Sequence, residues 1–114
     1  MRVQLEDDKI RVRIDEDELN ELLQDIALLG STAFGKAFTM RYAIDATDNA
    51  CTLSGTAHEW RMEVPREALR DLQSRLPSKD GLVFDIPGYD TVATTVRFDV
   101  DVKDSLRRRR DGAS

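Results

Sequence analysis

Within residues 9–23, the spacing of hydrophobic residues changes abruptly from that of a strand to that of a helix. This change constrains the fold more than any other feature of the sequence. Ile10, Val12 and Ile14 alternate with polar residues, which predicts a strand with one buried face. Leucines then follow at the spacing of an amphipathic helix. A strand that leads directly into such a helix predicts a domain in which helices pack on a sheet.

The boundaries of this helix are expected at residues 16–28. Asp15 is a typical N-cap, and Glu18 three residues later completes a capping box. Gly30 is the expected stop, because glycine commonly follows the last helical turn. The next segment, residues 30–38, is interpreted as a connection that either covers a pocket or makes a subunit contact.

The rest of the chain shows the same alternation. It predicts strands at residues 1–5, 36–45, 51–56, 58–64, 82–86 and 92–102, and a second helix between Pro65 and Pro77. The predicted fold is therefore α+β: a mainly antiparallel sheet of about six or seven strands with two helices packed on one face. The expected core comprises Ile10, Val12, Ile14, Leu19, Leu22, Leu23, Ile26, Met40, Tyr42, Ile44, Leu53, Trp60, Met62, Val64, Leu69, Leu72, Leu76, Val83, Val96, Phe98 and Val100.

Two parts of the sequence resemble each other. Residues 9–22 align without gaps on residues 59–72, with Arg11, Leu19 and Leu22 matching identical residues. Further along, residues 39–45 match residues 95–101 in pattern. Either the chain contains two β-α-β-type half-repeats, or any amphipathic strand followed by a helix would align this well.

Length and composition indicate one cytoplasmic domain. A chain of 114 residues can bury a core without a disulfide, and the single Cys51 is typical of a reducing compartment. No apolar run approaches the roughly 20 residues of a membrane helix, and no signal peptide is recognisable. Residues 1–104 are expected to form the domain, and residues 105–114 a disordered basic tail.

A set of arginines on the polar faces of the predicted strands is the candidate ligand site. If these strands are neighbours in one sheet, their guanidinium groups could hold a small anion. The alternative is a solvated face, because Asp45, Glu63 and Asp99 lie on the same strand faces and would pair with them. The candidate residues are Arg11, Arg13, Arg41, Arg61 and Arg97.

The C-terminal run Arg107, Arg108, Arg109 and Arg110 is a candidate nucleic-acid contact. The alternative is a solubilising tail, which the net charge of −5 and the lack of interleaved aromatic residues favour.

No catalytic or metal site is recognisable. His58 has no identifiable nucleophile to activate, and Cys51 is expected to be a small core residue. The acidic residues 15–21 lack the glycine and the distal glutamate of a calcium loop. The sequence therefore implies no metal and no cofactor.

The phrase at residues 10–19 resembles that of a small bacterial family without an assigned activity, a domain of unknown function that begins with two short strands and a sequence such as I-R-L-R-L-T-x-x-E-V. Tyr42 stands in the strand corresponding to that family's central aromatic strand, and residues 101–104 stand at its closing V-E-K-D-like phrase. Asp15 replaces the usual threonine, and Ser105 stands where an aromatic residue is expected. The resemblance implies a single α+β domain and adds no chemistry.

Three functions remain open at this point. The first is a small non-catalytic binding protein that forms a homodimer through sheet edges, since a strand as long as residues 92–102 must be paired or covered. The second is an enzyme or sensor for a small anion of unknown identity. The third is a nucleic-acid accessory protein that binds through the C-terminal arginines.

Overall fold

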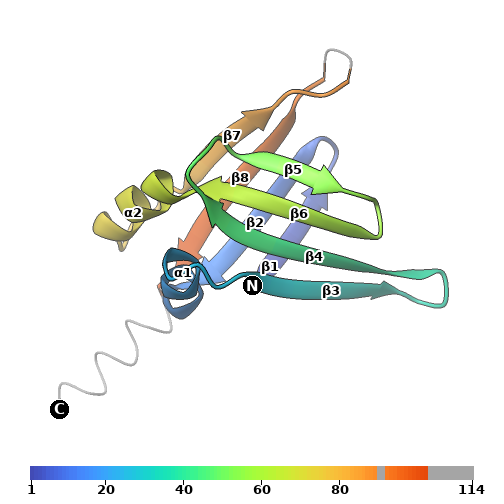
Figure 1. Cartoon of the computed structure of the whole chain (residues 1–114), viewed down its shortest axis with the longest axis horizontal. Helices are drawn as coiled ribbons and strands as arrows, with labels where there is room; N and C mark the ends of the chain where they lie inside the picture. The colour runs from blue at the N-terminus through green and yellow to red at the C-terminus, as the bar shows by residue number, and fades with distance from the viewer. Residues whose placement is uncertain (90–91, 103–114) are drawn as a thin grey trace.

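The computed structural model describes residues 1–89 and 92–102 (Figure 1). These residues form eight strands and two helices, in the order β-β-α-β-β followed by β-β-α-β-β. The first half comprises β1 (Arg2–Glu6), β2 (Lys9–Asp15), α1 (Glu16–Leu23), β3 (Leu28–Phe34) and β4 (Phe38–Thr47). The second half comprises β5 (Thr52–Gly55), β6 (Glu59–Pro65), α2 (Arg66–Ser74), β7 (Leu82–Ile86) and β8 (Thr94–Asp101).

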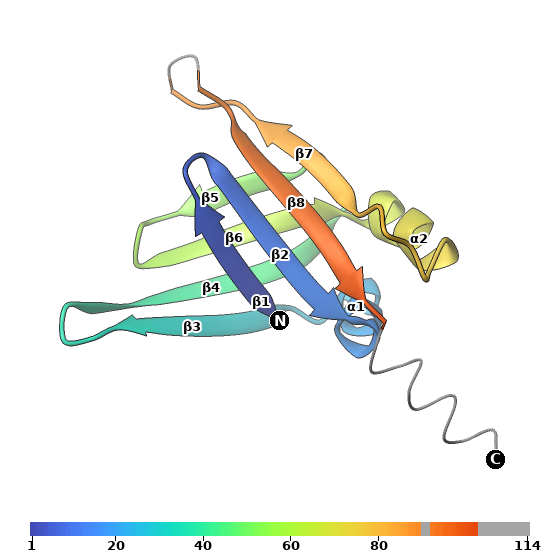
Figure 2. The ribbon, with the colours of Figure 1, turned by 180° about the vertical axis from the view of Figure 1, so that it is seen from behind.

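The strands form two sheets, so the prediction of one sheet with six or seven strands is wrong. Sheet A has the order β1-β2-β8-β7, and sheet B has the order β3-β4-β6-β5. Both are mixed, because their hairpins are antiparallel whereas β2 pairs with β8, and β4 with β6, in parallel. Each half of the chain thus contributes one hairpin to each sheet. Figure 2 shows sheet A in front of sheet B, with the strands crossing obliquely.

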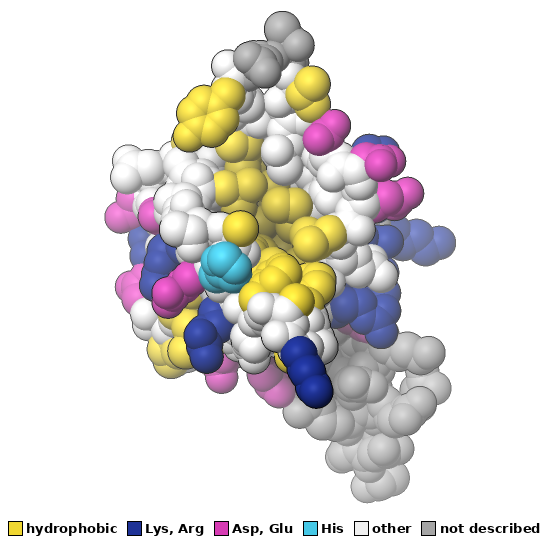
Figure 3. Space-filling model, turned by 90° about the vertical axis from the view of Figure 1, so that its right-hand side faces the viewer, with side chains coloured by type: hydrophobic (Ala, Val, Ile, Leu, Met, Phe, Trp, Pro, Cys, Tyr) yellow, Lys and Arg dark blue, Asp and Glu magenta, His cyan; other side chains and the backbone are white. Residues whose placement is uncertain are grey.

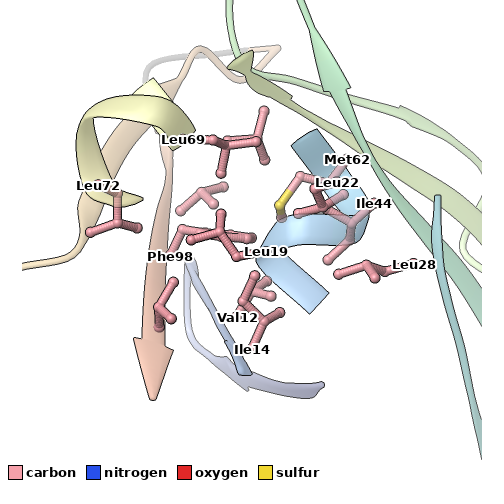
Figure 4. Packing of buried hydrophobic residues seen from close by; sticks show 13 residues of the cluster. Val12, Ile14, Leu19, Leu22, Leu28, Ile44, Met62, Leu69, Leu72 and Phe98 are labelled. Atoms are coloured by element: carbon pink, nitrogen blue, oxygen red, sulfur yellow. The ribbon is translucent and has the colours of Figure 1, made fainter. Parts of the chain in front are cut away.

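The core lies between the two sheets and is closed by the helices at one end. Leu19 and Leu22 of α1 and Leu69 and Leu72 of α2 point into the same interior (Figure 4). Helix α1 contacts strands of both sheets, so the helices do not simply cover one face as predicted. The fully buried large side chains are Val12, Ile14, Leu19, Leu22, Ile44, Met62, Val64, Leu69, Leu72, Val96 and Phe98, all of which were expected in the core.

Helix α1 begins where predicted and ends five residues early. The capping box is present, with the Glu18 amide donating to Asp15 Oδ1 at 2.8 Å and the Asp15 amide donating to Glu18 Oε1 at 3.1 Å. Asp25 adopts a left-handed conformation with φ of 62°, and this residue, rather than Gly30, turns the chain out of the helix.

The early helix end corrects two predictions. The segment after it is not a connection, because Leu28–Phe34 is the edge strand β3. Ile26 is 49% exposed and does not belong to the core, whereas Leu28 is buried. Val83 is also wrongly placed in the predicted core, since it is 61% exposed on the outer face of sheet A.

The two halves have matching strand registers. Adding 50 to a residue number in β1, β2 or α1 gives the equivalent residue in β5, β6 or α2. For β3 and β4 the increment is 54, so the pair Val12 and Phe98 corresponds to the pair Met62 and Ile44. The predicted match of residues 39–45 on 95–101 is therefore displaced by two positions. Two similar β-β-α-β-β halves fit this register better than two β-α-β units.

Candidate functional site

The five candidate arginines do not form one cluster. Arg11, Arg13 and Arg97 lie on β2 and β8 of sheet A, whereas Arg41 and Arg61 lie on β4 and β6 of sheet B. All five alternate with the core residues, so they project from the outer faces. Because the inner faces of the two sheets enclose the core, the two groups lie on opposite sides of the molecule.

Aspartates neutralise part of this charge. The Arg11 Nε donates to Asp99 Oδ2 at 2.9 Å, and the Arg97 Nε lies 3.6 Å from the same oxygen. On sheet B, Arg61 forms an ion pair with Asp45. The Arg11 and Arg61 pairs occupy equivalent positions in the two halves. Three of the five arginines therefore contact aspartates, as expected for a solvated, salt-bridged face rather than for a ligand site.

A hollow of about 350 Å³ lies on the outer face of sheet A between two rows of side chains. Arg11 and Arg97 stand opposite each other in one row, and Lys9 stands in the next. Glu6 is the acidic residue of the lining. The remaining lining residues are Gln4, Ile10, Val83 and Thr95. We call this the sheet A hollow.

Sheet B has a hollow of about 420 Å³ at the corresponding place. It contains Arg41 and Arg61, together with Glu59 and the nearly buried Ala43. Since Arg61 is paired with Asp45 and Glu59 adds another negative charge, this hollow is close to electrically neutral. The two hollows thus share a backbone framework and differ in charge.

The end of the molecule away from the helices is apolar. Phe34 stacks on Phe38 with ring centroids 4.5 Å apart, and the exposed His58 contacts the edge of Phe38 at 5.0 Å. Tyr42 stacks on Trp60 at 5.1 Å. Figure 3 shows hydrophobic side chains along a hollowed strip that passes beside the single histidine.

The free edge of β3 is a second apolar surface. The sequence indicated a subunit contact at residues 30–38, but through a connection rather than through an edge strand. Residues 26–35 contain no charged side chain, in a chain of which 34% is charged. Within this stretch Leu29 is 77% exposed and Phe34 is 43% exposed. The length of this uncharged run could have indicated an apolar surface. It was overlooked because a helix was expected over the first residues of the run.

The two residues considered for catalysis do not form a site. His58 lies in the turn between β5 and β6, where its carbonyl oxygen accepts from the Arg41 amide at 2.7 Å. Burial raises the pKa of the Cys51 thiol to about 11, so it stays protonated at neutral pH. Cys51 is half-buried, which agrees only partly with a core role. Over residues 1–89 and 92–102, no group of three His, Cys, Asp or Glu side chains could hold a metal ion.

Residues Arg107 to Arg110 lie outside the described residues, as does the predicted boundary after residue 104. In the part of the chain that the structure describes, no helix is long and apolar enough to cross a membrane. No protein-family model matches the sequence, and neither the curated proteins nor the solved structures include a match. The resemblance to a small bacterial family therefore stays a prediction.

Proposed function

We propose that this protein is a non-catalytic binding protein that works as a homodimer, joined by antiparallel pairing of the β3 edges of two copies. The observation that carries the proposal is the uncharged, exposed edge of β3. An unprotected strand edge presents unpaired amide and carbonyl groups, which readily add another strand. Proteins that remain monomeric usually protect such edges with charge, proline or short length.

The other strand edges are better protected, either by charged side chains or by short length. Strand β1 carries Arg2 and Glu6, and β7 carries Asp85. Strand β5 is uncharged but only four residues long. The long strand on which self-association was first predicted is not an edge at all, because β2 and β7 flank β8. The basis for a dimer thus moves from β8 to β3.

The sequence of β3 is compatible with pairing to itself. In an antiparallel pair centred on Ser31, Leu28 faces the partner copy's Phe34 position, and Leu29 faces its Ala33 position. Both pairs of positions carry apolar residues, of which Leu28 is already buried in the core, and no like charges meet. Sheet B would then continue into a second sheet B across a twofold axis, which is the commonest symmetry of homodimers.

Replacing Ser31 by lysine is expected to convert the dimer to a monomer, because two ammonium groups would face each other at the axis. Ser31 is exposed on the outer face of an edge strand, so the monomer should remain folded. The matched control is Ser54→Lys, which changes the same residue type on β5, the other edge of sheet B. Sedimentation velocity over the micromolar range measures both variants beside the wild type.

A wild type that sediments as a monomer throughout this range would refute the proposal. The same holds if Ser54→Lys breaks the dimer while Ser31→Lys leaves it intact, because the interface would then lie along β5.

A further inference from the structure

We infer that the sheet A hollow binds a small ligand through a phosphoryl group. This site does not depend on dimerisation, because it lies on the sheet opposite β3. It narrows the five candidate arginines to Arg11 and Arg97 and adds Lys9, which was not predicted.

Two adjacent guanidinium groups line the sheet A hollow. Arg11 and Arg97 are direct cross-strand neighbours, and like charges in that position repel each other. Asp99 lies two residues further along β8, opposite Arg13, and its side chain is only 11% exposed. It accepts from Nε of Arg11, and the same oxygen lies 3.6 Å from Nε of Arg97. One carboxylate therefore orients both groups and leaves one positive charge of the pair uncompensated.

Most N–H donors of these two guanidinium groups remain available for a ligand. A guanidinium has five N–H groups, and Asp99 engages only the Nε side of each. Over the described residues, the terminal nitrogens of Arg11 and Arg97 have no hydrogen-bond partner, and neither has the Lys9 ammonium. Three cationic groups thus line one hollow with donors available.

Sheet B carries different residues at the equivalent positions of the register. Arg11 corresponds to Arg61, but Lys9 corresponds to Glu59 and Arg97 corresponds to Ala43. The framework of the fold therefore does not require cations at the last two positions. Because Lys9 and Arg97 have no cationic counterparts on sheet B, we attribute them to ligand binding in the sheet A hollow rather than to stabilisation of the sheet.

The number and type of donors indicate the chemistry of the ligand. A phosphoryl group offers three peripheral oxygens to three cationic groups, and arginine pairs with it in a bidentate manner. A carboxylate offers two oxygens and would leave one cation unmatched. Glu6, opposite Lys9 in the register, limits the net charge of the lining, and so does the neighbouring Asp85, which accepts a hydrogen bond from the Thr95 hydroxyl at 2.9 Å. A hollow of about 350 Å³ accommodates a small molecule.

Inorganic phosphate is the probe for the first experiment, titrated into the full-length protein by calorimetry at constant ionic strength, with chloride as the balancing anion. We expect binding that weakens by about tenfold or more in Arg97→Gln, because one bidentate partner is lost. Arg97 is exposed, and Asp99 keeps its bond to Arg11 in this variant, so the fold should persist. Lys9→Gln tests a second cation independently, with the same expected direction.

The matched control is Arg41→Gln, which removes an exposed arginine from sheet B and should leave phosphate binding unchanged. Ser31→Lys should also bind phosphate like the wild type, which separates this inference from the proposed dimer. Glycerol phosphate and malonate extend the series to a phosphate monoester and a dicarboxylate. The inference is overturned if phosphate does not bind, if Arg41→Gln weakens binding as much as Arg97→Gln, or if malonate binds as tightly as phosphate.

Discussion

Phe98→Ala is expected to lower the free energy of unfolding by about 3–5 kcal/mol, the largest loss of any single truncation to alanine in this domain. Phe98 is fully buried on a central strand of sheet A, between Val12 on β2 and Leu82 on β7. Its removal leaves a cavity that the strands on either side cannot close, since their register is fixed by hydrogen bonds. A domain of this size has about 5–15 kcal/mol to lose.

Urea unfolding followed by the fluorescence of Trp60, the single tryptophan, measures this loss. Val83→Ala is the control, because Val83 lies on the neighbouring strand with its side chain 61% exposed. Its effect should stay within about 0.5 kcal/mol. Equal losses in the two variants would contradict the assignment of the inner and outer faces of sheet A.

Arg11→Ala is expected to lower the free energy of unfolding by about 1–2 kcal/mol. This loss lies between those measured for exposed and for buried ion pairs. The substitution leaves the nearly buried Asp99 with only the longer contact to Arg97. Arg61→Ala removes the equivalent arginine of the other half. It should cost less than about 1 kcal/mol, because the Asp45 side chain is 26% exposed and can be solvated.

Denaturant unfolding at neutral pH compares the two arginine variants. Adding Asp99→Asn to Arg11→Ala should recover part of the loss, because no buried charge is then left without its partner. A larger loss for Arg61→Ala than for Arg11→Ala, or no recovery in the double variant, would show that burial of the aspartate does not decide the cost.

The spacing of apolar residues predicted which side of β2, β4, β6 and β8 faces the core, but it failed for β7, where Val83 is exposed. Val12, Met62 and Phe98 are buried, while Arg61 and Arg97 are exposed, as alternation requires. Alternation describes one strand at a time, however, and contains no information on which strands pair. The division into two sheets was therefore missed, and with it the separation of the candidate arginines.

Strand β3 was missed for a different physical reason. Its inner face includes Gly30 and Thr32, so its alternation is weak. Gly30 is needed there, because a Cβ atom would come within 2.4 Å of the Tyr42 ring. The helix stop was assigned to this glycine, although Asp25 had already ended the helix. A close packing contact and an aspartate in a left-handed conformation both depend on the folded surroundings, which single-sequence patterns do not describe.

The exchange of hairpins between the two halves determines when the protein can fold during synthesis. When the ribosome has released residues as far as β4, strand β2 still lacks its parallel neighbour β8, which is the last strand within residues 1–89 and 92–102. Sheet A therefore stays half-built until β8 has been synthesised. Its apolar inner face lacks the cover of β8 over that interval, and such transient exposure of apolar surface favours aggregation of an incomplete chain.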